Sequence, residues 1–176
     1  VAVTQMEILD EEFARMYDHS PIHHIEYRIK SLDSIVDKLK RRGYEITIDN
    51  IYAHIQDLAG IRVICNYLDD IYYLRSLLTR FDAFKVIREV DYIKNPKPSG
   101  YRSLHLVVNV PIVISEGTMV LPVEIQLRTI AMDMWASLEH ELRYKSDRQF
   151  TDEDATRLRL CSDAISEIDQ EMQDIY

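Results

Sequence analysis

Basic side chains gather between residues 28 and 42, with a spacing that suits phosphate binding. Arg28 and Lys30 are two residues apart in a segment that alternates apolar and polar side chains, so on a strand they would share a face. Lys38 and Arg41 are three apart in the next helical segment and would be surface neighbours. Arginine grips phosphate as a fork and lysine as a point charge. A solvated basic helix end gives the same pattern, so the spacing alone leaves both interpretations open.

Two acidic side chains occupy separate predicted strands. Asp57 stands at the entrance of one strand, and Glu124 shares a face of another with Gln126 and Arg128. A carboxylate on a half-buried strand needs water, a cationic partner or a metal ion, because burying it alone is costly. Two carboxylates can hold Mg²⁺ together with substrate phosphates. A salt bridge across the sheet is the alternative for Glu124, and the sequence leaves it open.

The segment 94–105 predicts a rigid cationic loop that leads into a strand, because it holds two prolines, a glycine and two lysines. Tyr101 lies at its end and could stack on a base, a contact worth ~1–3 kcal/mol in nucleic-acid binders, or simply pack on the sheet. His105 falls on the polar face of the following strand, where it could contact phosphate or make an ordinary hydrogen bond.

Periodicity predicts the elements that must position these side chains. A turn at residues 115–117 joins the last two strands, Ser31 caps a helix, and Gly43 ends it. No linker or repeat divides the chain, so we expect one α+β domain over 1–176 with a mixed sheet of about five strands surrounded by helices. Helices are expected at 8–19, 32–42, 51–55, 69–80, 130–145 and 151–176, and strands at 25–30, 59–67, 84–93, 103–114 and 118–128.

Composition narrows the class of partner. The net charge of −9, from 21 basic and 30 acidic residues, argues against DNA, while the concentrated positive charge favours a small polyanion in a pocket. No apolar run approaches the ~20 residues of a membrane span. Residues 1–10 carry acids where a signal peptide needs bases, and Cys65 and Cys161 lack any metal-site spacing, so we expect reduced thiols in a cytoplasmic protein.

Taken together, the motifs resemble the RelA/SpoT-type synthetase domain, and specifically its short stand-alone bacterial members, the small alarmone synthetases. The resemblance covers about 22–145 in the expected order, and the chain's shortness, with no hydrolase domain before it and no long regulatory region after it, favours a stand-alone member. The matching segments are YRIKS at 27–31, KLKR at 38–41, DLAGIR at 57–62, NPKPSGYRSLH at 95–105, VEIQLRT at 123–129 and WASLEH at 135–140.

The resemblance implies a nucleotidyltransferase-like synthetase fold and a magnesium-dependent enzyme of the stringent response. Such a GTP pyrophosphokinase moves pyrophosphate from ATP to the 3′-hydroxyl of GDP or GTP and releases AMP. Glu124 is also a candidate acceptor of the hydroxyl proton. The implied roles are ATP binding for Arg28, Lys30, Lys38, Arg41 and Arg62, catalysis and Mg²⁺ binding for Asp57 and Glu124, and GDP or GTP binding for Lys97, Tyr101, His105 and Gln126.

Three points stay open at this stage. Residues 88–91 match neither charge pattern usual in larger family members, so the choice between GDP and GTP is undecided. Another acceptor, such as the 3′ end of tRNA, and a non-catalytic nucleotide sensor are the competing functions. The resemblance also implies a homotetramer built through the terminal helices 1–20 and 151–176, and the last of these carries an apolar stripe at Leu158, Cys161, Ile165, Ile168 and Met172.

Overall fold

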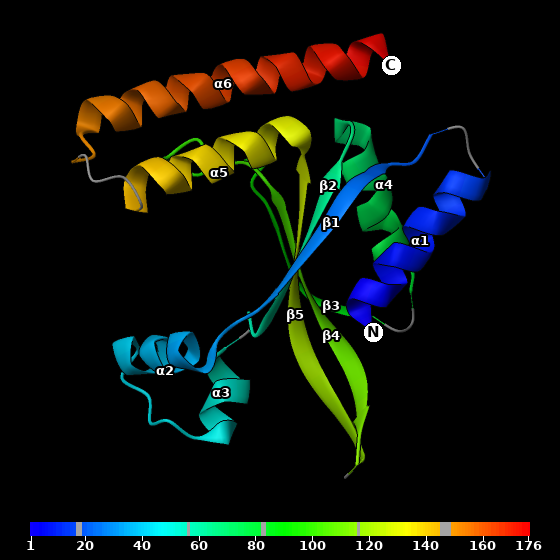
Figure 1. Ribbon diagram of the computed structural model, residues 1–176, viewed down its shortest axis with the longest axis vertical. Helices are drawn as coiled ribbons and strands as arrows, with labels where there is room; N and C mark the ends of the chain where they lie inside the picture. Colours follow the sequence, from blue (N-terminus) through cyan, green and yellow to red (C-terminus); the bar gives the residue numbers. More distant parts are fainter. Residues whose placement is uncertain (17–18, 56, 82–83, 116, 145–148) are drawn as a thin grey trace.

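The computed structural model describes residues 1–16, 19–55, 57–81, 84–115, 117–144 and 149–176, and it confirms an α+β fold built on one five-stranded mixed sheet (Figure 1). The strands are β1 (Ile22–Ile29), β2 (Ala59–Cys65), β3 (Lys85–Asp91), β4 (Leu104–Ile114) and β5 (Gly117–Thr129). The helices are α1 (Ala2–Met16), α2 (Leu32–Arg41), α3 (Ile48–His54), α4 (Leu68–Leu78), α5 (Ile130–Tyr144) and α6 (Asp152–Ile175).

The sheet order is β1-β2-β5-β4-β3, and only the central pair β2 and β5 is parallel. The other three pairs, β1 with β2, β4 with β5 and β3 with β4, are antiparallel. The parallel pair joins strands that are far apart in sequence, so β2 and β5 place side chains from the two halves of the chain side by side.

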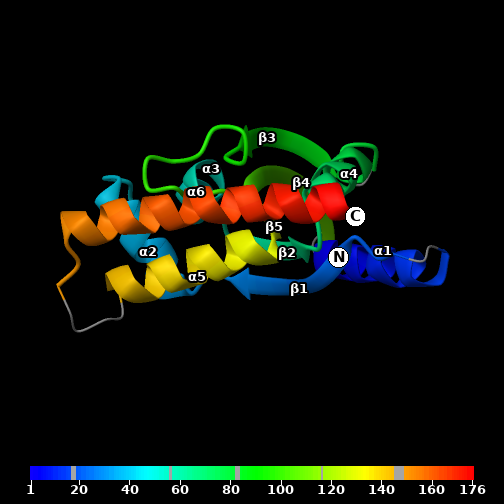
Figure 2. The same ribbon diagram turned by 90° about the horizontal axis from the view of Figure 1, so that it is seen from above.

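The main core lies between one face of the sheet and helices α1 and α4, which sit together on that side (Figures 1 and 2). Alternate residues of the central strands, such as Ile61, Val63 and Ile125, are fully buried there. Their neighbours along each strand therefore point to the opposite face, because side chains alternate across a sheet. On the side of that second face, α5 and α6 lie at one end of the sheet and α2 and α3 at the other (Figure 1).

Helix α1 begins earlier than the predicted helix at 8–19. Its buried stripe is Ala2, Met6, Leu9 and Phe13, whereas Ile8 is 51% exposed. The prediction was wrong about the start, because the buried stripe continues toward the N-terminus through Met6 and Ala2. Residues 17–18, where the predicted helix would end, lie outside the described residues.

The predicted cap of α2 is confirmed, because the Ser31 hydroxyl accepts a hydrogen bond from the Ser34 amide. Gly43 follows the helix with φ of +75°, a conformation that favours glycine. Helix α3 starts earlier than predicted, at a cap formed by Thr47. Part of the predicted turn at 115–117 falls on residue 116, which lies outside the described residues.

Helix α6 has 24 residues and packs along α5 (Figure 2). It begins with a capping box formed by Thr151 and Asp154. Two further contacts fasten it to the rest of the chain: the Trp135 indole donates to the Leu158 carbonyl at 2.8 Å, and the Thr129 hydroxyl donates to Asp169 at 2.6 Å.

Both cysteines are free, with Cys65 buried and Cys161 exposed. Among the described helices, none combines the length and the apolar character that crossing a membrane requires.

Candidate active site

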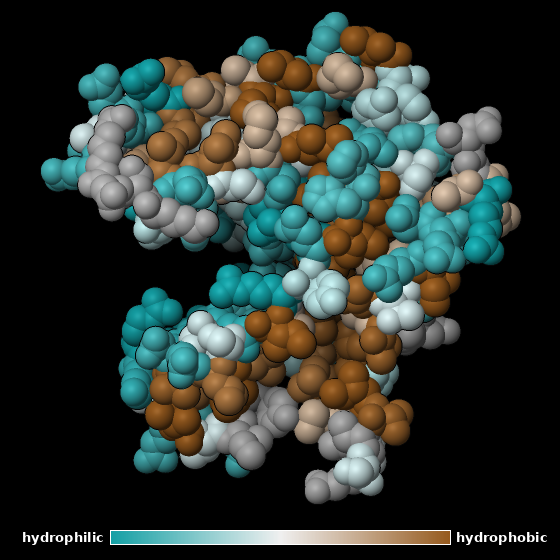
Figure 3. All heavy atoms as spheres, in the orientation of Figure 1, coloured by the Kyte–Doolittle hydropathy of each residue, from teal (hydrophilic) through white to brown (hydrophobic). Residues whose placement is uncertain are grey.

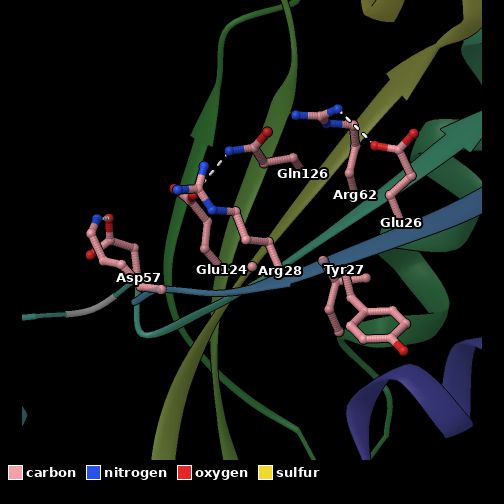
Figure 4. Close-up of a pocket in the computed structure, with 10 residues that line it drawn as sticks. Glu26, Tyr27, Arg28, Asp57, Arg62, Glu124 and Gln126 are labelled. Atoms are coloured by element: carbon pink, nitrogen blue, oxygen red, sulfur yellow. Dashed lines mark hydrogen bonds and ion pairs between the residues drawn. The ribbon is translucent and has the colours of Figure 1, made fainter. Parts of the chain in front are cut away.

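A polar cleft of about 320 Å³ opens on the uncovered face of the sheet. It appears as the hydrophilic hollow between the upper and lower lobes of the molecule (Figure 3), and its side chains are drawn in Figure 4. The residues that line it are Glu26, Tyr27, Arg28, Lys30, Asp57, Gly60, Ile61, Arg62, Glu124 and Gln126.

Strand register explains why these polar side chains meet. Residues paired across a sheet point to the same face, so each row of paired residues lines one side of it. One row crosses all five strands and places acidic and basic groups together: Arg28, Gly60, Glu124, Val107 and Arg88. The adjacent row on the same face consists of Glu26, Arg62, Gln126, His105 and Val90.

Asp57 sits between two lysines. Its two carboxylate oxygens accept hydrogen bonds from Lys30 and Lys38, each at 2.7 Å. Burial by itself raises the pKa of Asp57, but the hydrogen bonds and positive charges of the two lysines outweigh it and leave the pKa below its ordinary value. Asp57 is therefore a charged carboxylate at neutral pH, and it holds both lysines at the edge of the cleft.

Glu124 is held by partners on its own face of the sheet. His105 Nδ1 lies 3.3 Å from Oε1, and the Gln126 amide donates to Oε2 at 2.9 Å. The hydrogen bond with His105 is the largest influence and lowers the pKa of Glu124; burial opposes it, and Gln126 adds to the lowering. The charge of Asp57 acts in the opposite direction and raises the pKa, so the two carboxylates are close enough to repel each other.

A second, smaller hollow adjoins the cleft and includes Arg88 of β3 in its lining. Asp57 and Glu124 line both cavities, so the two acids stand where the two hollows adjoin. The other side chains of the second hollow are mostly basic: Lys38, Arg42, His54 and Arg88, with Val107. Positive groups thus stand on both sides of the carboxylate pair.

The predicted acceptor residues form a connected cluster beside Glu124. The Tyr101 hydroxyl lies 2.8 Å from His105 Nε2 and accepts a hydrogen bond from Arg128 at 2.6 Å. The Lys97 ammonium lies over the Tyr101 ring, 4.6 Å from its centroid. Because His105 also contacts Glu124, the loop residues and the strand carboxylate belong to one network.

The predicted ATP-side arginines differ in their placement. Arg28 lines the cleft, and Arg62 lines it while donating to Glu26 at 2.9 Å and lying 3.4 Å from Asp133. Arg41 is exposed and is not among the described residues lining either cavity. Its neighbour Arg42 lines the second hollow and donates to the His54 carbonyl at 3.0 Å.

Sequence reasoning missed several residues of this site. Arg128 is 4% exposed and donates to Asp133, Gln126 and the Tyr101 hydroxyl, so it orients both the strand and the loop. Its position on the face of Glu124 was a signal that could have identified it. Arg88 carried no such signal, because its place beside the cleft depends on the register of β3 against β4.

The carboxylate pair fits a magnesium ion. Mg²⁺ prefers oxygen ligands, retains several waters and is commonly held by one or two carboxylates plus substrate phosphates. Asp57 and Glu124 are charged, partly exposed and mutually repelling, so a cation between them would relieve that repulsion. Within the described residues no group of three or more acidic, histidine or cysteine side chains is placed to hold a metal ion.

Comparison with known proteins gives a consistent result. Residues 27–149 match the family model described as the region found in RelA/SpoT proteins. The GTP pyrophosphokinase YwaC of Bacillus subtilis is 44% identical over 154 residues, covering 85% of this chain and 73% of that protein. The GTP pyrophosphokinase YjbM of the same organism is 40% identical over 158 residues, covering 90% and 74%.

Solved structures agree with the sequence matches. The small alarmone synthetase 1 of B. subtilis, bound to its product pppGpp, superposes with a TM-score of 0.88 at 37% identity and covers 98% of this chain and 87% of its own. The small alarmone synthetase 2 of B. subtilis also gives 0.88 at 37% identity, covering 99% and 89%. The predicted synthetase fold is confirmed.

Proposed function

This chain belongs to the RelA/SpoT family, and we propose that it transfers pyrophosphate from ATP to the 3′-hydroxyl of GDP or GTP, releasing AMP. One observation carries the proposal: Asp57 and Glu124 line one cleft together with basic side chains, and His105 connects Glu124 to the Lys97–Tyr101 cluster. The names of the relatives, which include GTP pyrophosphokinases and a synthetase bound to pppGpp, support the same reaction.

The donor triphosphate is assigned to the basic side of the cleft. Lys30 and Lys38 are held in place by Asp57, so their ammonium groups are ordered before a nucleotide arrives. Arg28 and Arg62 line the same cleft and supply planar guanidinium groups for phosphate or for the adenine face. Positioning of this kind supplies most of the catalysis in phosphoryl transfer, because little covalent chemistry is required of the protein.

The acceptor nucleotide is assigned to the loop cluster. Tyr101 offers its ring to guanine, while Lys97 and His105 provide positive or hydrogen-bonding groups for the acceptor phosphates. Gln126 donates a hydrogen bond to Glu124, and we assign to it the orientation of the ribose beside that carboxylate. This arrangement brings the acceptor 3′-oxygen toward the carboxylate pair, where the β-phosphorus of ATP is to be attacked in line.

Glu124 is the proposed acceptor of the hydroxyl proton. Its pKa is lowered, chiefly by the hydrogen bond with His105, so at neutral pH it is deprotonated, as a proton acceptor must be. Asp57 and Glu124 are the proposed ligands of Mg²⁺, which when bound neutralises phosphate charge and stabilises the departing AMP oxygen. The protein's own groups hold the two nucleotides, fix their approach and receive the proton.

A labelled-donor assay tests the proposal. The purified chain is incubated with Mg²⁺ and ATP labelled at the γ-phosphate, and GDP, GTP or deacylated tRNA is added in separate reactions. We expect label on the guanosine nucleotide together with unlabelled AMP. Label on tRNA alone would replace the acceptor that we propose. Nucleotide binding with no AMP release would indicate a sensor and would remove the catalytic assignment.

A homotetramer and a cytoplasmic location complete the proposal. Both terminal helices expose large apolar side chains, among them Ile8 and Met16 on α1 and Ile168 and Met172 on α6, as a self-association surface would. Leu158 and Ile165 of the predicted stripe are half-buried instead. Helix α5 adds an exposed row at four-residue spacing that sequence reasoning missed: Ile130, Met134, Leu138 and Leu142. Light scattering of the purified chain should give four times the monomer mass.

A further inference from the structure

The loop between β3 and β4 is stabilised by backbone hydrogen bonds between its own residues. At its base the Tyr92 amide donates to the Ser103 carbonyl at 2.9 Å, and nearer its tip the Lys97 amide donates to the Tyr101 carbonyl at 3.1 Å. These hydrogen bonds tie Lys97 to Tyr101, and the Gly100 amide also donates to the Lys97 carbonyl at 2.8 Å, so a contact at Gly100 bears on the positions of both side chains.

Helix α6 contacts this loop at Gly100. The Ser162 hydroxyl, on a residue that is 3% exposed, donates to the Gly100 carbonyl. Gly100 has φ of +95°, and a Cβ at this position would lie 2.8 Å from Ser162 Cβ and 3.4 Å from Arg159 Cα. Glycine is therefore required here for two reasons, the backbone conformation and the close approach of the helix.

A second contact fastens the same loop to α6. The Arg102 guanidinium donates two hydrogen bonds: one nitrogen donates to Asp163 at 3.1 Å and a second donates to the Ile93 carbonyl at 3.2 Å. One side chain thus joins the beginning of the loop, its end and the helix. At the opposite side, Asp91 accepts from the Tyr72 hydroxyl of α4 at 3.1 Å, and so the loop is held between two helices.

We propose that Ser162 is a positioning residue for the acceptor nucleotide: through Gly100, helix α6 sets the place of Tyr101 and thereby the affinity for GDP or GTP. The proposal rests on the proposed function for the identity of the acceptor. The effect is specific to the acceptor side, because within the described part of the chain the hydrogen bonds of α6 do not reach the residues that line the donor cleft. No group assigned to chemistry touches Ser162.

The variant Ser162→Ala removes the hydroxyl without adding bulk. Helix α6 should stay docked, because Trp135 still donates to its backbone and Thr129 still donates to Asp169. Loss of one hydrogen bond to the loop is expected to raise KM for GDP or GTP about three- to tenfold while KM for ATP stays within about twofold. The variant Gly100→Ala should raise the acceptor KM further, since its methyl group would press the loop away from the helix.

Ser166→Ala is the matched control. Ser166 lies one turn along α6, is half-buried, and has no side-chain hydrogen bond to another described residue. Calorimetric titration of GDP and of the unreactive donor α,β-methylene ATP should reproduce the split as a weaker GDP affinity alone. An unchanged acceptor KM in Ser162→Ala would overturn the proposal. So would an equal rise in both KM values, or the same changes in Ser166→Ala, because each would mean a general structural effect.

The outcome separates this proposal from the proposed function. If the parent protein forms no labelled guanosine nucleotide, the proposed reaction is wrong, whatever Ser162 does. If the parent is active and only the Ser162→Ala result fails, the reaction stands and the positioning role of α6 is wrong. The calorimetric GDP titration compares the parent with Ser162→Ala whether or not the parent is active, because binding is measured without turnover.

Discussion

Asp57 offers a direct test of the electrostatics of the cleft, because one carboxylate is shared by two lysines. Lys30 and Lys38 each donate at 2.7 Å, and all three side chains are between 20% and 31% exposed. Hydrogen bonds to charged groups contribute about 1.5–3 kcal/mol when buried, whereas exposed ion pairs contribute about 0–1 kcal/mol. For this partly exposed pair of contacts we take about 1 kcal/mol each, or about 2 kcal/mol in all.

The variant Asp57→Asn keeps the shape of the side chain and removes its charge. It should lower the free energy of unfolding by about 2 kcal/mol at neutral pH, or roughly 4–8 °C in Tm for a chain of this length. Asp57 has its pKa lowered from the ordinary 3.8 in the folded state, so in the unfolded state it binds a proton at higher pH than in the folded state. Its contribution is therefore fully present above that value and is lost as the pH falls through the lowered pKa.

Urea unfolding in EDTA, followed by circular dichroism from about pH 7 down to about pH 3, measures this difference without any metal contribution. Asp37→Asn, an exposed acid on the same helix as Lys38, is the matched control and should change little. A double-mutant cycle with Lys38→Met isolates the pair. The reasoning would be refuted if Asp57→Asn were as stable as the parent at neutral pH, or if the deficit did not shrink in acid.

Four further outcomes are expected. Glu124→Gln should abolish synthesis with Tm nearly unchanged, and product formed at the parental rate would exclude its role. Arg128→Met should lower the free energy of unfolding in urea by about 3 kcal/mol and raise the acceptor KM, since among the described residues Asp133 would keep only the 3.4 Å contact with Arg62. Burial raises the pKa of Asp169, so the parent protein's free energy of unfolding should fall as the pH rises through that pKa. The variant Asp169→Asn should not show this fall. Identical pH profiles for the two proteins in urea unfolding would contradict the raised pKa. Chelation by EDTA should stop the reaction reversibly without lowering Tm, and full activity in EDTA would exclude Mg²⁺.

Residue types and local spacing predicted that some of the polar side chains share a face of the sheet, and the structure places Arg28, Lys30 and Glu124 in one cleft. Arg28, Lys30 and Glu124 could be chosen because strand alternation fixes their face from sequence alone. The five-stranded mixed sheet also followed from periodicity. What local patterns do not contain is the register between distant strands, and that register is what brings Arg88 and His105 onto the face of Glu124.

Side-chain surroundings were equally beyond local patterns. The sequence treated Tyr101 as an isolated ring at the end of a loop, whereas its hydroxyl binds His105 and Arg128 and its ring carries the Lys97 ammonium. These partners come from the loop itself, β4 and β5, so only the folded arrangement reveals them. The hydrogen bond from Ser162 of α6 to Gly100 joins residues 62 positions apart, and no local sequence pattern predicts it.

The end of helix α2 is a further place where sequence and structure point to different residues. At the end of α2 the sequence favoured Arg41 through its spacing from Lys38, but Arg42, the C-cap, is the arginine whose side chain lines the second hollow. A helix end departs from the regular period, so a neighbour can replace the residue that the period selects. The role assigned to Arg41 stays a prediction, which exchange of either arginine for alanine and measurement of KM for ATP can decide.

Both nucleotides are expected to bind in one cleft, against the Asp57 and Glu124 carboxylates. Diffraction from crystals grown with α,β-methylene ATP, GDP and Mn²⁺ in place of Mg²⁺ tests it most directly. We predict an anomalous manganese peak between the two carboxylates, the triphosphate beside Lys30 and Lys38, and guanine on the Tyr101 ring. Nucleotides bound elsewhere, or manganese away from both carboxylates, would contradict the account.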